Sequence, residues 1–342
     1  MTVARGQAEK LAGRKVLVTG ASGFIGGHLC QRLVESGAEV HALSRYARSG
    51  AGSPLTWWEG DVAEFKTVRA LFRKIQPDTV FHLASHVMGA PNLEHVLPTF
   101  RANLQSSVNL LTAAAEIGCR RLVLTGSLAE PEPSKGEIFP SAPYAAAKWA
   151  SSGYARMFHA LYGVPAVIAR VFMVYGPAQR DLTKLIPYVI LSLLQGKPPK
   201  IASGERLVDW IYVGDVVEAY IALAETAGIE GSTVEIGSGK LLTIREIVNR
   251  VADLVGSGIA PSFGALPDRP MEPVRIANVA QTYERIGWKP VTTLTTGLQR
   301  TIEWYREHIS ELVTVDNHYP PNPDIHEAEV TDHPGRRATK VR

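Results

Sequence analysis

The chain has 342 residues, of which 45% are apolar and 20% charged, and its 36 basic and 33 acidic residues give a formal net charge of +3. This composition excludes a chain that is disordered throughout, and at roughly 150 residues per domain the length predicts two domains. The balanced charge provides no electrostatic basis for binding nucleic acid.

Cysteine usage and hydropathy indicate the compartment. Cys30 and Cys119 are too few for a disulfide framework or a Cys-rich metal site, and they fit a reducing environment. The apolar run Leu185–Leu194 is far shorter than the roughly 20 residues that cross a bilayer, and the N-terminus lacks the apolar region of a signal peptide. We therefore expect a cytoplasmic protein without a membrane span or metal centre.

Short β-branched runs alternate with helical patterns through the first half of the chain. This alternation predicts right-handed strand–helix–strand crossovers, and hence the α/β class with a doubly wound, Rossmann-type parallel sheet. The predicted strands are Lys15–Thr19, Glu39–Leu43, Thr79–Leu83, Leu122–Thr125 and Ala166–Val171, and the predicted helices are 25–36, 64–75, 97–117 and 143–161.

The second half of the chain is richer in helices. Two short strand candidates, Leu207–Val213 and Thr233–Ile236, either extend the main sheet or form a small second one. The expected arrangement is a smaller, mainly helical lobe over the carboxyl edge of the sheet. Its predicted helices are 182–195, 214–226, 243–255, 279–286 and 294–307.

The clearest motif runs from Thr19 to Gly26, where a buried strand leads into three glycines and then a helix. Gly20 permits a tight turn, Gly23 lets the backbone approach a pyrophosphate, and Gly26 allows close helix–strand packing. Free N–H groups and the helix dipole favour the diphosphate, which makes a dinucleotide site a better interpretation than a turn without a ligand. The residues expected beside the cofactor are Gly20, Ser22, Gly23, Phe24, Ile25 and Gly26.

This motif assigns roles to the parts of the chain. Residues 13–176 are expected to form the dinucleotide-binding domain, with a returning segment near 205–235. Residues 177–312 are expected to form mainly the substrate-binding lobe. Residues 1–12 are then an N-terminal extension, and the aperiodic residues 313–342 are a disordered tail.

The end of the second strand bears on which cofactor binds. An acid there accepts hydrogen bonds from both ribose hydroxyls of NAD, whereas a base accommodates the 2′-phosphate of NADP. Here Ser44 and Arg45 follow Leu43, with Arg48 beyond and no acid nearby. We expect NADP, with NAD as the alternative in which the arginines are solvated loop charges. Asp61 is a candidate acceptor for the adenine amino group, or equally the N-cap of the next helix.

A candidate catalytic pair lies on one predicted helix. Tyr144 and Lys148 are spaced i, i+4 and therefore share a face. A neighbouring ammonium lowers the pKa of a phenol, which makes the phenol useful as an acid or base near neutrality. Ser127 ends the preceding strand at the edge where such sheets bind ligands, and can hydrogen-bond a reacting oxygen. An isolated Tyr–Lys pair is more often a surface feature, but the glycine loop and Ser127 favour catalysis.

Further motifs follow in a fixed order along the chain. They are Gly60-Asp61-Val62, His82-Leu83-Ala84-Ser85, Arg101-Ala102-Asn103-Leu104, Val174-Tyr175-Gly176-Pro177, the run from Val208 to Val216, and Ile286-Gly287-Trp288-Lys289-Pro290. With the glycine loop, Ser127 and the Tyr–Lys pair, residues 13–308 resemble the extended short-chain dehydrogenase/reductase family, in its NAD(P)-dependent nucleotide-sugar epimerase, dehydratase and ketoreductase branch.

The resemblance implies roles for individual residues. Tyr144 would transfer the proton, Lys148 would bind the nicotinamide ribose and tune Tyr144, and Ser127 would orient the substrate oxygen. Arg269 would grip the substrate diphosphate unless it is a surface loop charge, and His86 would line the sugar pocket unless it is an unliganded loop residue. Further cofactor contacts would come from Ser44, Arg45, Asp61, Val62, Leu83, Ala84, Ser85, Asn103, Lys148 and Val171.

Departures from the family pattern narrow the reaction. Leu128 and Ala129 stand where dehydratases carry an Asp–Glu pair, and Glu130 comes one residue late, which argues against 4,6-dehydratase chemistry. Val208 stands where many members carry an arginine for the sugar-nucleotide diphosphate, and Arg206 is the candidate substitute on the same strand face.

The expected activity is an NADP-dependent ketoreductase of a nucleotide-activated 4-keto-6-deoxy sugar, because biosynthetic reduction draws on NADPH and Ser44-Arg45 favours it. One alternative is an NAD-dependent nucleotide-sugar 4-epimerase, and another is a reductase of a non-nucleotide ketone. A different class of protein, a non-enzymatic NADP-sensing regulator, would not need Ser127, Tyr144 and Lys148 together. The resemblance also implies a homodimer, for which Leu104, Val108, Leu111 and Ala114 form a candidate apolar stripe.

Overall fold

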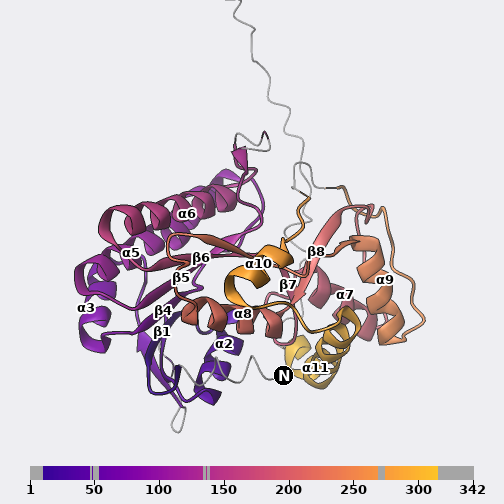
Figure 1. Ribbon diagram of the computed structural model, residues 1–342. Coiled ribbons are helices and arrows are strands. Elements are labelled where there is room, and N and C mark those ends of the chain that lie inside the picture. The colour runs from indigo at the N-terminus through magenta and orange to yellow at the C-terminus, as the bar shows by residue number, and fades with distance from the viewer. Residues whose placement is uncertain are drawn as a thin grey trace, which may run out of the picture.

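The structure of the chain is a computed structural model that describes residues 11–46, 48, 54–133, 136, 139–268 and 274–314 (Figure 1). Arg269, the first ten residues and residues 315–342 lie outside the described part, so the predicted extension and tail are largely not described. Leu11 is buried in the core, which therefore begins slightly before the predicted boundary at residue 13.

The main sheet has seven strands in the order β3-β2-β1-β4-β5-β6-β9, and every pairing in it is parallel. The order reverses direction at β1, as expected for a doubly wound sheet, so the predicted fold class is confirmed. The strands are β1 (Lys15–Thr19), β2 (Glu39–Ser44), β3 (Leu55–Glu59), β4 (Thr79–His82), β5 (Arg121–Ser127), β6 (Ala166–Val171) and β9 (Thr233–Ile236).

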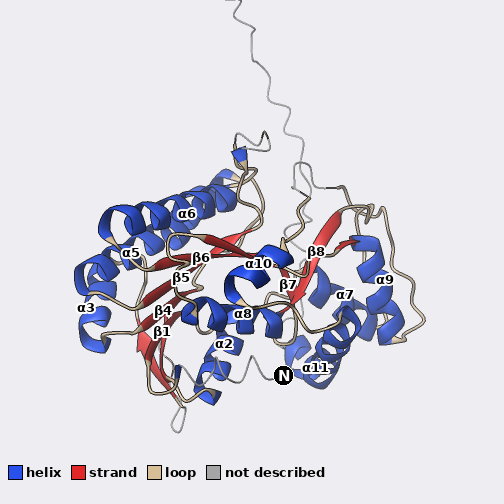
Figure 2. Cartoon of the chain, viewed as in Figure 1, coloured by secondary structure: helices blue, strands red, loops and turns tan. Residues whose placement is uncertain are grey.

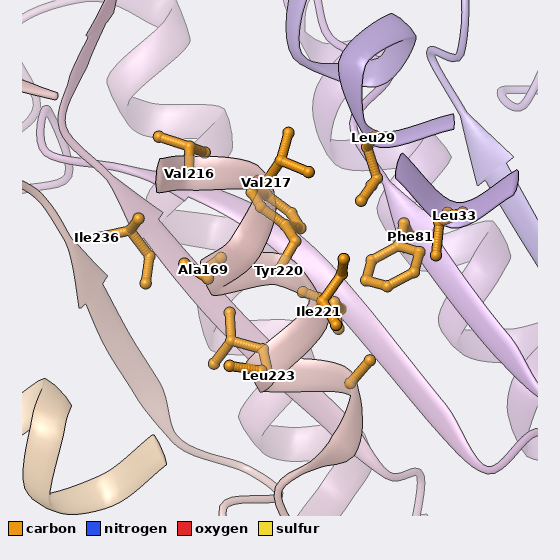
Figure 3. Close-up of a cluster of buried hydrophobic side chains, with 14 of the residues drawn as sticks. Leu29, Leu33, Phe81, Ala169, Val216, Val217, Tyr220, Ile221, Leu223 and Ile236 are labelled. Carbon is orange, nitrogen blue, oxygen red and sulfur yellow. The ribbon is translucent and has the colours of Figure 1, made fainter. Parts of the chain in front are cut away.

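Helices cover both faces of this sheet (Figure 1). One face carries α3 (Phe65–Ile75), α5 (Ser106–Ile117) and α6 (Pro143–Tyr162), which bury their apolar sides against the strands. The other face carries α2 (Phe24–Glu35) and α8 (Val213–Glu225). Figure 3 shows the second of these cores, in which Tyr220 and Ile221 of α8 lie near Phe81 of β4 and Leu29 of α2. Both faces of the strands are buried, which explains their unbroken apolar sequences.

The predicted helix at 97–117 is interrupted. A 3₁₀ turn, η2 (Leu93–His95), leads into α4 (Val96–Thr99), then into a π-helical segment, η3 (Phe100–Gln105), and only then into α5. Single π-turns commonly mark functional sites, and this one contains the buried Asn103. The apolar periodicity continues through the segment, so the sequence pattern did not reveal the interruption.

Helix α5 uses part of the apolar stripe that was predicted for a partner subunit. Leu111 and Ala114 are buried within this chain's own core, whereas Leu104 and Val108 are half-buried. The homodimer stays a prediction, and of the four residues assigned to its interface only Leu104 and Val108 are still partly accessible to a partner.

The second lobe is built on a three-stranded sheet in the order β10-β8-β7 (Figure 2). The two strand candidates of this half behave differently, because β9 joins the main sheet and β8 forms the small one. Among the described residues, no helix is both long and apolar enough to cross a membrane. The lobe comprises β7 (Met173–Tyr175), β8 (Leu207–Tyr212), β10 (Leu241–Thr243), α7 (Leu185–Leu194), α9 (Ile244–Val255) and α11 (Leu294–Thr314), while α10 (Val279–Ile286) contacts β9 of the main sheet.

Asp209 on β8 links the small sheet to the segments that surround it. Its carboxylate is buried and accepts hydrogen bonds from the Ser238 backbone N–H at 2.7 Å, the Ser238 hydroxyl at 2.6 Å, the Gly239 N–H at 3.0 Å and the Ala277 N–H at 3.0 Å. One side chain thereby holds the turn after β9 and the segment before α10 against β8.

Replacing Asp209 should consequently be costly. Asp209→Ala leaves four donors without their acceptor, one of them buried and three partly buried, and we expect the free energy of unfolding to fall by about 3–5 kcal/mol. Asp253→Ala, at an exposed position on α9, is the matched control and should change it by less than about 0.5 kcal/mol. Urea denaturation measures both, and equal unfolding midpoints for the two variants would contradict the assignment.

Candidate active site

Three predicted catalytic residues meet at the carboxyl edge of the main sheet. Ser127 is the last residue of β5, and α6 begins at Pro143, a residue whose fixed φ suits the first turn of a helix. Tyr144 and Lys148 therefore project from the first two turns of α6. The Tyr144 hydroxyl is hydrogen-bonded to the Ser127 side chain, and Lys148 Nζ lies 5.8 Å from the Tyr144 ring centre.

Lys148 is held by the backbone of β5. Its side chain is 4% exposed, and Nζ donates a hydrogen bond to the Thr125 carbonyl at 2.8 Å. Burial lowers the pKa of Lys148 to about 8, against which the carboxylate of Glu130 acts to raise it. At neutral pH the group is therefore mostly an ammonium ion beside Tyr144.

The protonation of Tyr144 differs from the sequence expectation. Burial raises the pKa of Tyr144 to about 12, with the hydrogen bond from Ser127 acting to lower it and the charge of Glu130 adding to the rise. The expected lowering of this pKa by Lys148 is therefore wrong for this structure, in which desolvation of the phenolate is the largest influence. Tyr144 is a neutral phenol at neutral pH, which is the protonation state of a proton donor.

The glycine loop has the geometry expected of a dinucleotide site. Gly20 has φ +70°, and a Cβ atom there would lie 2.5 Å from the Ala84 backbone nitrogen. Gly23 precedes the first turn of α2, and among the described residues no side chain caps that helix. Its first N–H groups are thus available to an anion. A Cβ atom at Gly26 would collide with the Gly20 carbonyl oxygen, which confirms the predicted close packing of helix on turn.

A cavity of about 420 Å³ lies beside this loop. Ser22, Gly23 and Phe24 form one wall, and Arg48, Trp57 and Arg180 stand on the others. Sequence reasoning missed Arg180, because it lies in the loop after β7, far along the chain. The cavity, the uncapped helix start and the crowding at Gly20 together fit a dinucleotide phosphate.

A basic and an acidic side chain both lie near the end of β2, where the adenosine ribose is expected. Arg45 is exposed directly after β2. Burial acts to raise the pKa of Asp61, but the Ala63 N–H, Arg101 and, to a smaller extent, Arg45 lower it overall. Ser44 is buried, and its register partner on β3 is Glu59, which is exposed. An acid therefore does lie next to the second strand, one strand further out, where the linear sequence did not show it.

Asp61 is not a helix N-cap. Its carboxylate accepts the Ala63 N–H at 2.9 Å and a guanidinium hydrogen bond from Arg101 at 2.9 Å, while α3 begins later, after Glu64. The hypothesis that it caps the helix is thus wrong. Its position at the turn after β3 leaves the adenine contact as a prediction, and the neighbouring Val62 is buried in the core.

The loop after β4 is clamped by the π-helical segment. Asn103 Oδ1 accepts hydrogen bonds from the Ser85 hydroxyl at 3.1 Å and the His86 N–H at 2.7 Å, and its Nδ2 donates to the His86 carbonyl at 3.1 Å. Asn103 therefore positions this loop rather than projecting freely into the site. Leu83 and Ala84 are fixed through their N–H groups to the Thr19 carbonyl and hydroxyl.

His82 lies beneath this loop and was given no role in the sequence analysis. Its ring nitrogens are hydrogen-bonded to the Thr19 hydroxyl at 2.7 Å and the Ser106 hydroxyl at 3.1 Å. Burial and the nearby Lys148 charge lower its pKa to about 3. His82 is therefore a neutral tie between β1, β4 and α5.

Comparison with known proteins places this geometry in a family. The model of the NAD dependent epimerase/dehydratase family matches residues 16–237, well over half of the chain. A probable dTDP-glucose 4,6-dehydratase of Sinorhizobium fredii is 32% identical over 86% of this chain and 93% of its own, and a UDP-glucose 4-epimerase of Mycolicibacterium smegmatis is 30% identical over 85% and 98%. The solved structure of MoeE5 in complex with UDP-glucuronic acid and NAD has a TM-score of 0.76 at 30% identity, over 86% of this chain and 99% of that one.

The chain belongs to the NAD-dependent epimerase/dehydratase family. It is accordingly an enzyme of this type, and the regulatory alternative is set aside. The resemblance drawn from the motifs is confirmed.

On the substrate side, the family pattern is less complete. Val208 is buried in the core of the second lobe, so it offers no charge to a ligand. Arg206 lies just before β8, half-buried, and its carbonyl accepts the Ile244 N–H at 3.0 Å. Val171 ends β6 in register with Ser127 and places its backbone beside the catalytic edge.

Two adjacent glycines in α2 give a controlled test of the loop. Gly26→Ala places a methyl group against the Gly20 carbonyl, and we expect a loss of about 1–3 kcal/mol in stability together with weaker NADPH binding. In Gly27→Ala the new methyl group meets only the Ala21 carbonyl oxygen at 3.9 Å, so this variant should gain about 0.5–1 kcal/mol in stability from helix propensity. Chemical denaturation and NADPH fluorescence titration report both, and equal behaviour of the pair would refute the packing argument.

Proposed function

We propose that this member of the family is an NADP-dependent ketoreductase of a nucleotide-activated 4-keto-6-deoxy sugar. The observation that carries the proposal is the geometry of the site: Ser127 ends β5, Tyr144 lies against it, and Lys148 Nζ is held on the Thr125 carbonyl 5.8 Å from the Tyr144 ring centre. Burial also raises the pKa of the Tyr144 phenol, which favours its protonated form. A protonated phenol is ready to donate, which is the state that reduction of a carbonyl needs at its oxygen.

Three residues of the chain have different roles at the substrate carbonyl oxygen. The Ser127 hydroxyl orients and polarises the carbonyl oxygen, and Tyr144 Oη passes its proton to the developing alkoxide. Lys148, fixed on the Thr125 carbonyl, stabilises the negative charge that Tyr144 would acquire. Bound NADPH supplies the hydride for this reduction. Ser127 and Lys148 are buried and Tyr144 is half-buried, which limits competing exchange with water.

A dehydratase reaction is disfavoured even though curated relatives carry that name. Water elimination needs an acid and a base facing the sugar, and Leu128 and Ala129 provide neither. Glu130, the carboxylate next along the chain, is buried and accepts the Ser127 backbone N–H at 2.8 Å. It is thereby engaged within the protein and does not face a substrate.

The NAD-dependent 4-epimerase remains the second candidate. One relative is named a UDP-glucose 4-epimerase, and MoeE5 was solved with NAD. A single tyrosine also suffices for epimerisation, since it can remove and return one proton. Glu59, in register with Ser44, supports this candidate because an acid near the adenosine ribose favours NAD.

The preference for NADP rests on Arg45, with Arg48 and Arg180 beside the cavity at the glycine loop. Guanidinium groups bind phosphate through paired hydrogen bonds, and a 2′-phosphate adds one such partner to the adenosine ribose. Ser44 presents no like charge to repel it. The substrate contacts proposed for His86, Arg206 and Arg269 follow from the same reaction, and the dimer and cytoplasmic location stay proposals.

The reaction itself is tested with a panel of nucleotide-activated 4-keto-6-deoxy sugars and NADPH. We expect oxidation of one NADPH for each sugar reduced, and Tyr144→Phe should lower turnover by about 10²–10⁴-fold, because the proton donor is lost while NADPH binding is kept. Absorbance at the nicotinamide band and product mass measure both.

Two outcomes would count against the proposal. Interconversion of C4 epimers without net consumption of cofactor identifies the epimerase instead. Undiminished turnover of Tyr144→Phe on any productive sugar overturns the role of the phenol.

Cofactor preference is tested separately at Arg45. Arg45→Ala should weaken NADPH binding by about tenfold and leave NADH binding almost unchanged, because one charge-assisted phosphate contact is removed. Arg73→Ala, an exposed arginine on α3, is the control and should affect neither. Ser44→Asp should shift the preference towards NADH. Fluorescence titration of the unmodified chain and the three variants with NADPH and NADH gives the dissociation constants, and tighter binding of NADH than NADPH by the unmodified chain would refute the preference.

A further inference from the structure

Glu130 is a buried carboxylate directly beneath the catalytic turn. Its exposed fraction is 0%, although it lies in a short turn after β5. Oε1 accepts a hydrogen bond from the Ser127 backbone N–H at 2.8 Å, and the Glu130 N–H donates to the Ser127 carbonyl at 3.2 Å. The side chain and backbone of one residue thus close the turn that carries Ser127.

Space for this carboxylate is created by Gly126. A Cβ atom at Gly126 would lie 2.6 Å from Glu130 Oε1, so a side chain there would displace the carboxylate. On the adjacent strand, the register partner of Gly126 is Arg170, and its guanidinium lies 3.9 Å from Glu130 Oε2. The carboxylate therefore occupies the place of a missing side chain at the end of β5.

Lys148 binds the same strand end from the neighbouring helix. Its ammonium donates a hydrogen bond to the Thr125 carbonyl, and the Glu130 carboxylate accepts one from the Ser127 N–H. The two side chains therefore bind the peptide groups on either side of Gly126. Because both are buried, their interaction is screened less than at a surface. Burial is the larger influence on both groups and lowers the pKa of Lys148 while raising that of Tyr144; the negative charge of Glu130 acts against the first change and adds to the second.

A salt bridge with Arg170 does not explain why a carboxylate is buried at position 130. Arg170 already contacts the carboxylates of Glu132 at 3.0 Å and Glu235 at 3.5 Å, both closer than Glu130. Burying a further carboxylate costs several kcal/mol unless its hydrogen bonds and charge partners compensate it. The contacts that are particular to Glu130 are those with the catalytic turn.

We propose that Glu130 is a positioning residue of the active site, whose carboxylate fixes the Ser127 turn and supplies the countercharge that keeps Lys148 an ammonium ion beside Tyr144. This inference rests on the proposed function for its relevance to catalysis, but the coupling itself is a property of the protein. The groups that face the Glu130–Lys148 pair are Tyr144, Lys148 and Ser152 of α6, Arg170 of β6 with Glu132 and Glu235 behind it, the neutral His82 of β4, and the neutral Tyr220 of α8.

The test titrates Lys148 directly and needs no substrate. In protein labelled with [ε-¹³C]lysine, the Lys148 signal, assigned by its loss in Lys148→Arg, should titrate with a midpoint near pH 8. Glu130→Gln keeps an acceptor for the Ser127 N–H and removes the charge. Since that charge favours the ammonium, the midpoint should fall by about one pH unit.

Glu132→Gln is the matched control, because it removes a carboxylate from the same Arg170 without touching the Ser127 turn. It should leave the Lys148 midpoint at the wild-type value. A wild-type midpoint in Glu130→Gln, or an equal fall in both variants, overturns the proposal.

A reciprocal measurement covers the case in which Glu130→Gln does not fold. Burial raises the pKa of Glu130, and the Ser127 N–H, Arg170, Ser152 and the Lys148 ammonium act to lower it. Lys148→Met removes one of these opposing groups, so the Glu130 carboxyl signal in [δ-¹³C]glutamate-labelled protein should titrate at higher pH than in the wild type. Linkage requires the same coupling from both sides. An unchanged Glu130 titration overturns the proposal.

The catalytic consequence is read with whichever sugar the wild-type enzyme reduces. Reduction needs the protons of Tyr144 and Lys148, and loss of the Glu130 charge lowers the pKa of both. The alkaline limb of the kcat profile should therefore move to lower pH by about one unit in Glu130→Gln and stay in place in Glu132→Gln. If no sugar is reduced, the proposed function fails, while the lysine titration still decides the role of Glu130.

Discussion

The hydrogen bond from Lys148 to the Thr125 carbonyl sets the geometry of the catalytic edge. It joins the first turns of α6 to the end of β5, and Tyr144, one helical turn away from Lys148, is thereby brought to Ser127. The bond has an energetic cost, because the ammonium is buried and the pKa of Lys148 falls from 10.5 to about 8. Between these pH values the unfolded chain binds more protons than the folded one, so this group opposes folding below pH 8 and the penalty is relieved as the pH rises.

The rest of the structure supports that contact from both sides of β5. Towards β4, the neutral His82 is tied to Ser106 of α5, and Asn103 holds the loop that follows β4. Towards β6, the pairing of Ser127 with Val171 and of Gly126 with Arg170 continues the sheet to its last residue. The second lobe is attached by similar means, since Asp209 satisfies four donors from segments far apart in the chain. Buried polar groups thus define the positions that apolar packing alone leaves free.

The fold was predictable because its signals are local. β1 and β6 occur at the predicted residues, and the glycine loop, α6 and the Ser–Tyr–Lys set follow from patterns within a few residues of one another. What was missed depends on tertiary contacts. β7 and β10 are three residues long, too short for a periodic signal, and Glu59 lies beside Ser44 only through strand register. The prediction that the pKa of Tyr144 is lowered was wrong for the same reason. Helix spacing reveals the nearby lysine but not the desolvation of the phenol.

Glu130 shows why a catalytic motif can be misinterpreted from the linear sequence alone. One residue away from the dehydratase position, it looks like a displaced acid, and sequence spacing has no means of distinguishing a carboxylate that faces substrate from one that faces the interior. Gly126 and Arg170 decide the matter, the first by leaving room and the second by adding a cation on the adjacent strand. A single-residue shift after a strand end turns a side chain to the other side of the turn. In this family fold, that shift converts a group suited to acid–base chemistry into one that acts on the charge of its neighbours.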